Sequence, residues 1–241
     1  MVLMVAAGFL VLNYVRSPAT TPAMRGHQLA GEHGCFACHG PDGGRFYPMS
    51  AGSQFPLWDQ QSMGMIIEKE EDIRSWILDG RPASDPSGAA PPSDTKVGAR
   101  VSMPAYRGLI GGRELEDLIA YYRALTFRDP RIPREAREGR EVAGRKGCFT
   151  CHGPAGRGGI QNPGSFKGYI PPFDGPDFDS LVRDNDELRS WILDGTIPRF
   201  RENPLARYFI ERQVITMPAY EGHITASEVD SIVYYIRYLR R

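Results

Sequence analysis

Two short stretches decide how this chain folds, CFACHGP at residues 35–41 and CFTCHGP at residues 148–154. Each has two cysteines separated by two residues and followed directly by a histidine, and these four cysteines are all that the chain contains. Cys-x-x-Cys-His is the motif at which c-type haem is attached. We therefore predict two covalently bound haem c groups, one on Cys35 and Cys38 and the other on Cys148 and Cys151.

The spacing within this motif has a chemical reason. Two thiols about one helical turn apart each reach one vinyl group of the porphyrin, and the imidazole that follows reaches the iron as an axial ligand. His39 and His152 are the predicted ligands. A zinc site would instead pair two Cys-x-x-Cys units across about 15–20 residues, whereas more than 100 residues separate them here. A thioredoxin-like redox pair would need a strand and a helix around it, and it gives the histidine no role.

The second half of the chain repeats the first. The second cysteine motif follows the first by 113 residues, RSWILDG occurs at 74–80 and again at 189–195, and MPAY occurs at 103–106 and again at 217–220. Order and spacing are kept to within two residues, which is typical of two copies of one domain. We predict an N-terminal helix and linker over 1–22, a first domain over 23–127 and a second over 128–241.

The pattern of apolar residues predicts helices and no strands. The spacing of three and four residues that is typical of an amphipathic helix is followed by two sets: Leu115, Leu118, Ile119, Tyr122 and Leu125, and Val229, Ile232, Val233, Ile236 and Leu239. Thr225 and Glu228 form a capping box before the second set. Helices are also expected at 74–78 and 189–193, each ended by Asp-Gly, and before each cysteine motif. Four stretches are expected to be long loops: 40–62, 81–102, 153–176 and 196–216.

The sixth position of each iron decides between an electron carrier and a catalyst. Met217 is the one methionine of the second copy, and Met103 stands at the equivalent place in the first. A thioether is a soft, neutral ligand that raises the potential of haem iron, so we predict Met103 and Met217 as the second axial ligands. The first copy holds further candidates that compete for this position: Met24, Met49, Met63, Met65, His27 and His33.

From residue 24 to the end, the chain resembles a tandem di-haem class I cytochrome c, through CxxCHGP, MPAY and the closing amphipathic helix in both halves. The resemblance implies an all-α fold in which the first and last helices of each domain cross and a methionine loop covers the distal side of the haem. It also implies that the carbonyls of Pro41 and Pro154 accept a hydrogen bond from the proximal histidine. It says nothing about the physiological role.

Three further pairs of repeated residues are candidates for contacts around the haem. Trp76 and Trp191 are expected to pack beside it, and Tyr106 and Tyr220 to form hydrogen bonds near the methionine loop. Arg74 and Arg189 suit bidentate contacts with haem propionates, or they are solvated residues on a helix surface.

The charge balance and the N-terminal segment indicate which partners and which location to expect. With 29 basic and 29 acidic residues among 241, the chain has no general basic field with which to bind nucleic acid. Residues 1–15 are apolar except for Asn13, and we predict that they anchor the protein to a membrane with the haem domains on the extracytoplasmic side. A cleaved signal peptide and an apolar helix docked on a partner are the alternatives.

Together these features predict a membrane-associated electron carrier rather than an enzyme, without catalytic residues of its own. It would pass single electrons between donor and acceptor proteins, as a subunit of a membrane redox complex. The alternative is a di-haem peroxidase-like enzyme with one open haem site, and the identical methionine motifs in the two halves count against it.

Overall fold

The computed structural model describes residues 20–40, 43, 58, 67, 69–81, 103–126 and 132–241. The chain divides into two compact units, Pro22–Asp129 and a second one that contains Pro130–Arg241. We call them the N-terminal unit and the C-terminal unit. Within the described residues both are helical, and the β-structure is limited to two isolated bridges, Arg107 with Ile110 and Gln161 with Tyr169.

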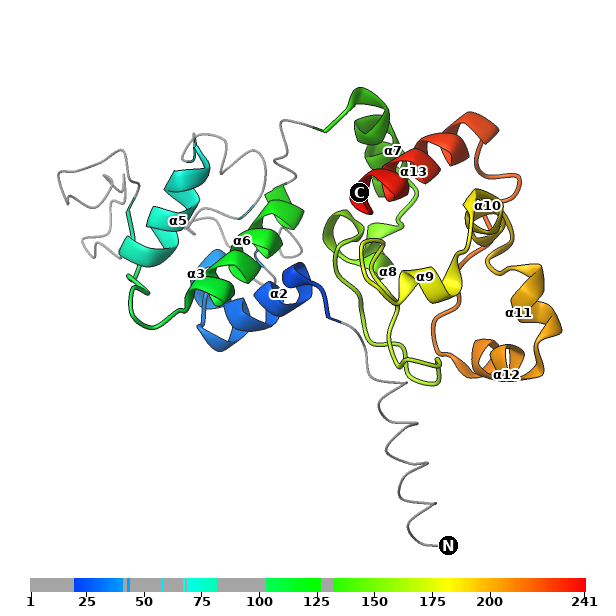
Figure 1. Cartoon of the computed structure of the whole chain (residues 1–241), viewed down its shortest axis with the longest axis horizontal. Coiled ribbons are helices and arrows are strands. Elements are labelled where there is room, and N and C mark those ends of the chain that lie inside the picture. Colours follow the sequence, from blue (N-terminus) through cyan, green and yellow to red (C-terminus); the bar gives the residue numbers. More distant parts are fainter. Residues whose placement is uncertain are drawn as a thin grey trace, which may run out of the picture. The chain divides into compact units, whose positions relative to one another are not determined.

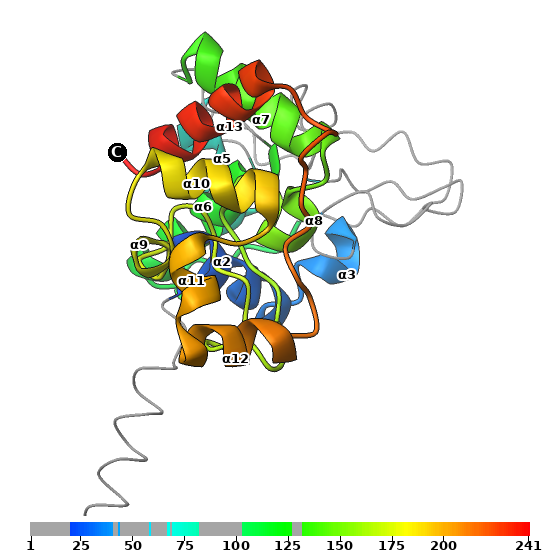
Figure 2. The same cartoon turned by 90° about the vertical axis from the view of Figure 1, so that its right-hand side faces the viewer.

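The described residues of the N-terminal unit form two long helices and two shorter ones. Its helices are α2 (Pro22–Glu32), α3 (Phe36–His39), α5 (Glu70–Asp79) and α6 (Gly112–Thr126). Helix α2 packs along α6, as both views of the molecule show (Figure 1 and Figure 2). The apolar set predicted on α6 faces the core, where Leu115, Leu118, Ile119 and Tyr122 are buried.

The C-terminal unit repeats this plan. Its elements are α7 (Arg134–Arg145), α8 (Phe149–His152), the single 3₁₀ turn η2 (Pro154–Gly156), α9 (Phe178–Leu181), α10 (Asn185–Asp194), α11 (Pro198–Glu202), α12 (Pro204–Arg212) and α13 (Ala226–Leu239). Helices α7 and α13 cross in contact, as Figure 1 and Figure 2 both show. The predicted capping box is confirmed, because the Thr225 hydroxyl accepts from the Glu228 amide and the Glu228 carboxylate accepts from the Thr225 amide.

In each unit a glycine allows the first and last helices to cross closely. A Cβ added at Gly26 would lie 1.9 Å from the carbonyl oxygen of Asp117 on α6, and one added at Gly139 would lie 1.9 Å from that of Ser231 on α13. No side chain larger than hydrogen fits at either crossing, because carbon and oxygen atoms in contact lie more than 3 Å apart.

The prediction of a loop over 196–216 is wrong, because the structure has α11 and α12 there. Pro198 and Pro204 stand at the starts of these helices, where the fixed φ of proline suits a helix and its missing N–H costs nothing. The Asn203 side chain caps α12 by accepting from the amides of Leu205 and Ala206. Neither α11 nor α12 has a buried residue. The loops predicted at 40–62 and 81–102 lie almost wholly outside the described residues.

Within the described part of the chain, no helix is both long enough and apolar enough to cross a membrane. The longest of them, α6, has 15 residues, which corresponds to about 22 Å against a hydrocarbon core of about 30 Å. This finding corrects the prediction of a membrane-anchored protein, which no helix among the described residues supports. The segment to which the anchor was assigned, residues 1–15, lies outside the described residues.

Candidate functional site

The two cysteine motifs form the same short helix in the two units. In the C-terminal unit the Cys148 carbonyl accepts from the amides of Cys151 (3.3 Å) and His152 (3.0 Å). The corresponding bonds from Cys38 and His39 to the Cys35 carbonyl are 3.3 and 3.0 Å long. One helical turn therefore separates the cysteines of each pair. All four cysteines are free thiols and half-buried, so each pair is available to attach a porphyrin.

In the C-terminal unit, the orientation of the histidine is fixed by a carbonyl group. His152 Nδ1 lies 2.9 Å from the Pro171 carbonyl oxygen, so Nδ1 carries the proton and Nε2 is the nitrogen that can bind iron. Burial lowers the pKa of His152, which favours the neutral imidazole that metals bind. The prediction that Pro154 supplies the acceptor is wrong. Its carbonyl instead accepts from the Arg157 amide at 2.9 Å, within the turn that follows the motif.

A second repeated feature lies next to each histidine, and the sequence analysis missed it. The His152 ring lies 4.5 Å from the Phe173 ring, and the His39 ring lies 5.0 Å from the Trp58 ring, measured between centroids. The signal was present in the sequence, because FPLWD at 55–59 matches IPPFD at 170–174. Residues 41 and 56, the remaining candidates for the acceptor of His39, lie outside the described residues.

The predicted methionine ligands lie on extended segments that dock on the preceding helix. The amide of Tyr220 donates to the Ile192 carbonyl on α10 at 3.1 Å, and that of Tyr106 donates to the Ile77 carbonyl on α5 at 3.2 Å. The glycine that ends each helix permits this approach. A Cβ on Gly195 would lie 2.4 Å from the Met217 carbonyl oxygen, and one on Gly80 would lie 2.3 Å from that of Met103.

Both of these glycines also have the left-handed backbone conformation, with φ of 68° at Gly80 and 69° at Gly195. Glycine is thus required there twice, by conformation and by space. The repeated Asp-Gly is therefore part of the site as well as a helix stop.

The tyrosine of each MPAY segment joins the methionine segment to the cysteine motif. The Tyr220 hydroxyl donates to the Lys146 carbonyl at 2.8 Å, and the Tyr106 hydroxyl donates to the His33 carbonyl at 3.1 Å. Lys146 and His33 each stand two residues before the first cysteine of a motif. The prediction of tyrosine hydrogen bonds near the methionine loop is confirmed.

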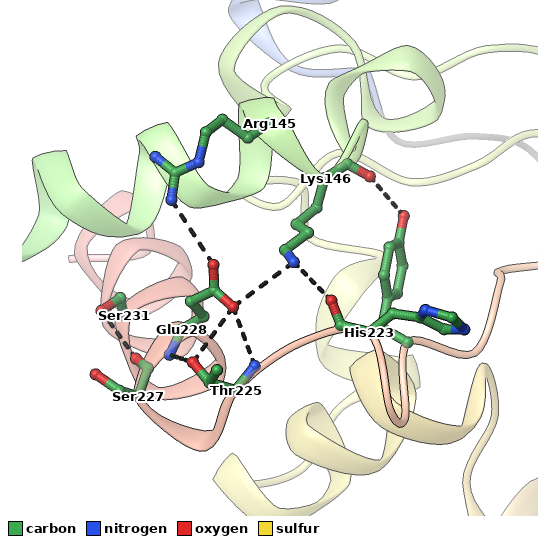
Figure 3. A network of polar contacts seen from close by, with 8 residues as sticks. Arg145, Lys146, His223, Thr225, Ser227, Glu228 and Ser231 are labelled. Atoms are coloured by element: carbon green, nitrogen blue, oxygen red, sulfur yellow. Dashed lines mark hydrogen bonds and ion pairs between the residues drawn. The ribbon is translucent and has the colours of Figure 1, made fainter.

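The side chain of Lys146 adds a connection in the C-terminal unit (Figure 3). Its ammonium donates to the His223 carbonyl at 2.6 Å and lies 3.6 Å from Glu228 Oε2. Glu228 also accepts from the Thr225 amide at 3.0 Å, and this hydrogen bond lowers the pKa of its carboxyl group. The segment before Cys148, the methionine segment and the start of α13 are thus held together by one polar network.

The tryptophans pack against the two cores, in line with part of their prediction. Trp191 and Met217 lie on the core of the C-terminal unit, and Trp76 lies on that of the N-terminal unit. Trp191 Nε1 donates to the Leu181 carbonyl at 3.0 Å.

The arginines of the repeated block bind protein carboxylates. Arg74 bonds both carboxylate oxygens of Glu116, and Arg189 Nη2 lies 2.8 Å from Asp230 Oδ1. These exposed ion pairs favour the helix-surface interpretation over the propionate one.

The residues of the two units fit a haem group. Each unit offers two free thiols one turn apart, a histidine beside an aromatic ring, and a methionine on a segment fixed to the residue two positions before the cysteine motif. Trp76 Nε1 is buried without a hydrogen-bond partner in the described part of the chain, and a propionate oxygen is a suitable acceptor for it. No cluster of three or more His, Cys, Asp or Glu that could hold a metal ion occurs among the described residues.

Of the competing candidates for the sixth position, Met24 and His27 lie on α2, where His27 is exposed. Met49, Met63 and Met65 lie outside the described residues. His33 is half-buried beside the first cysteine motif, with its ring edge-on to Tyr106 at 5.8 Å between centroids. The choice of Met103 and Met217 as ligands stays a prediction.

Among known proteins the chain is similar to cytochrome c4 from Azotobacter vinelandii, with 29% identity over 132 residues. The match covers 52% of this chain and 55% of that protein, so the chain spans about half the length of the curated relative it matches. No protein-family model matches the chain, and no solved structure matches it. The similarity is therefore to a cytochrome of the c type.

Proposed function

We propose that this chain is a di-haem cytochrome c that carries single electrons between partner proteins. Each unit binds one haem: the first is attached to Cys35 and Cys38 and ligated by His39 and Met103, the second is attached to Cys148 and Cys151 and ligated by His152 and Met217. The haem supplies reversible one-electron exchange between ferric and ferrous iron.

One observation carries this proposal. In both units the methionine segment is fixed to the residue two positions before the cysteine motif by a tyrosine hydroxyl, and its methionine carbonyl lies against a glycine that no other residue can replace. Two copies that differ at most other positions keep this arrangement. A site in which one haem is left open for a substrate would need the two copies to differ at the methionine, and they do not.

The protein's task in such a reaction is to keep both ligands in place. The Pro171 carbonyl holds the His152 ring in one orientation, and the docked segment holds the Met217 thioether. Neutral ligands kept in both oxidation states reduce the rearrangement that accompanies electron exchange. The partners proposed for this exchange are redox proteins.

The test is a count of haems and of iron–thioether bonds in the purified protein. We expect two haems c per chain, two equivalents of the near-infrared ferric iron–thioether band, and no reaction of the ferrous protein with carbon monoxide. Met103→Leu and Met217→Leu should each remove one equivalent of that band. Met24→Leu is the matched control, since it makes the same change of side chain at a methionine of α2. It should remove none of the band, because Met24 is not a proposed ligand.

Other outcomes distinguish the alternatives. A band of one equivalent together with carbon monoxide binding at one haem would support the peroxidase-like enzyme. A colourless, zinc-containing protein would exclude haem chemistry altogether. A band that survives both Leu substitutions would refute ligation by Met103 and Met217 and assign the thioether to another methionine, while leaving the haem count intact.

A further inference from the structure

A single loop of the C-terminal unit contacts the segments of both predicted axial ligands. The loop runs from Gly159 to Phe173, and its two sides are joined by hydrogen bonds from the Ile170 amide to the Ile160 carbonyl (2.9 Å) and from the Asn162 amide to the Gly168 carbonyl (2.8 Å). Near its C-terminal end the loop includes Pro171, whose carbonyl fixes the orientation of His152.

The turn of the same loop, which begins at Asn162, contacts the segment that leads to Met217. Asn162 is buried, with 2% of the residue exposed. Its Oδ1 accepts from the Ile215 amide at 2.9 Å, and its Nδ2 donates to the Ile215 carbonyl at 2.9 Å. The carboxamide thus pairs with both polar groups of one residue, as a neighbouring strand would. Nδ2 also lies 3.5 Å from Gln213 Oε1, at the limit for a hydrogen bond.

The backbone around Asn162 strengthens this contact. The Val214 amide donates to the Pro163 carbonyl at 3.0 Å. Gly164 has φ of 83°, and a Cβ there would lie 2.1 Å from the Arg212 carbonyl oxygen. The turn at 162–165 is therefore shaped to lie directly on residues 212–215.

Met217 lies between two fixed points of this segment. Ile215 is held by Asn162 on one side, and Tyr220 is held on the other by the Ile192 carbonyl and the Lys146 carbonyl. Only four residues, 216–219, lie between these points, so the position of the thioether depends on both. Losing the Asn162 side-chain contact moves the upstream fixed point from Ile215 back to Val214, whose amide donates to the Pro163 carbonyl.

We propose that Asn162 is a positioning residue for Met217: its paired hydrogen bonds to Ile215 hold the thioether on the iron of the second haem. This inference rests on the proposed ligation by Met217. Asn162 itself touches neither the iron nor the porphyrin in this role and acts only through the backbone of Ile215.

The substitution that isolates this role is Asn162→Asp. It keeps the size of the side chain and the acceptor Oδ1, but it replaces the donor Nδ2 by an oxygen that faces the Ile215 carbonyl oxygen. Asn203→Asp is the matched control. Asn203 accepts from the amides of Leu205 and Ala206 through Oδ1 alone, so aspartate keeps those bonds. Asn162→Ser is the second, uncharged variant, too short to reach both groups of Ile215.

The measurements use the holoprotein in the Met103→Leu background, so that the near-infrared band reports Met217 alone. We expect Asn162→Asp and Asn162→Ser to weaken that band and to let imidazole replace the thioether at the second haem about tenfold more readily, which corresponds to about 1.4 kcal/mol. The far-UV circular dichroism should stay unchanged, and Asn203→Asp should behave as the parent in both measurements.

Three results would overturn the proposal. The first is a normal band and normal imidazole binding in both Asn162 variants. The second is an equal effect of Asn203→Asp, which would trace the change to charge. The third is loss of the far-UV signal in both Asn162 variants, which would give Asn162 a role in folding as a whole. Failure of the proposed function looks different, because Met217→Leu would then leave the band intact.

Discussion

The crossing of α7 and α13 allows a prediction with opposite signs at two glycines of one helix. Gly139 and Gly144 both lie on α7. A Cβ at Gly139 would lie 1.9 Å from the Ser231 carbonyl oxygen and 2.9 Å from Tyr235 Cβ. A Cβ at Gly144 would meet nothing closer than Phe149 Cε2 at 3.6 Å, an ordinary contact. Alanine is therefore excluded at the first position and accepted at the second.

The expected magnitudes follow from the clash and from helix propensity. At Gly139 the two helices must separate by roughly 1.5 Å to restore a normal contact. Overpacking of this kind costs about 3 kcal/mol at the upper end of its usual range, and the better helix propensity of alanine returns about 1 kcal/mol. We expect Gly139→Ala to lower the free energy of unfolding by about 2 kcal/mol, and Gly144→Ala to raise it by up to about 1 kcal/mol.

Differential scanning calorimetry of the holoprotein is the suitable assay, because two units need not unfold in one transition. For a domain of this size, 2 kcal/mol corresponds to a fall in Tm of about 10 °C and 1 kcal/mol to a rise of about 5 °C. Gly26→Ala and Gly31→Ala repeat the experiment on α2, where the nearest atoms lie at 1.9 Å and 3.7 Å. The reasoning fails if Gly139→Ala and Gly144→Ala shift Tm in the same direction.

Three smaller predictions concern the polar contacts of the C-terminal unit. Arg199 holds the pKa of Glu187 at about 2, so the pair stabilises the fold above the ordinary carboxyl pKa of about 4.3, and this stability is lost as the pH falls toward 2. Tm measured over this pH range should depend less on pH in Glu187→Gln than in the parent, and an equal pH dependence would refute this role of the pair. Tyr220→Phe removes the hydrogen bond to Lys146 and should cost about 1 kcal/mol and weaken the near-infrared band of the second haem, whereas a variant with normal stability and a normal band would show that the bond has no such role. Arg189→Ala breaks only exposed ion pairs and should change the free energy of unfolding by less than about 1 kcal/mol, with no shift in either haem potential. A shifted potential would instead indicate that Arg189 contacts a haem propionate.

The sequence was sufficient for the parts of the fold that depend on local patterns. The apolar spacing placed α6 and α13, and Thr225 with Glu228 marked the start of the latter. The repeated Asp-Gly marked the ends of α5 and α10. Each of these features follows from residues within one helix, so no knowledge of the tertiary structure was needed to predict them.

The sequence failed where a local signal has two physical meanings. Proline and polar residues at 196–216 indicated a loop, but Pro198 and Pro204 begin helices. Helix α12 has no buried residue and leaves Leu205 63% exposed. The spacing of its apolar residues therefore does not correspond to a buried face. The residue that could have indicated this helix in the sequence is Asn203, which caps its N-terminus.

The acceptor for His152 could not be found from residue types at all, because every residue carries a carbonyl group. Pro154 was the nearest proline to the motif, but the next residue, Ala155, has φ of 52°, and the chain turns back there. The loop returns Pro171 to the histidine only after the Asn162 turn. The signal that survives in the sequence is the match of IPPFD at 170–174 to FPLWD at 55–59.

The comparison of the two units separates what the site requires from what each unit adds. Glycine beside the methionine carbonyl and tyrosine bonded to the segment before the motif occur in both units, so they belong to what the two proposed haem sites have in common. At the residue bonded by the tyrosine, the C-terminal unit has Lys146, whose ammonium reaches His223 and Glu228, and the N-terminal unit has His33. The backbone carbonyl does the shared work at this position, which leaves the side chain free to differ. The same comparison applies to Phe173 and Trp58, which lie against the histidines proposed as ligands: an aromatic ring stands at this place in both units, and the kind of ring differs.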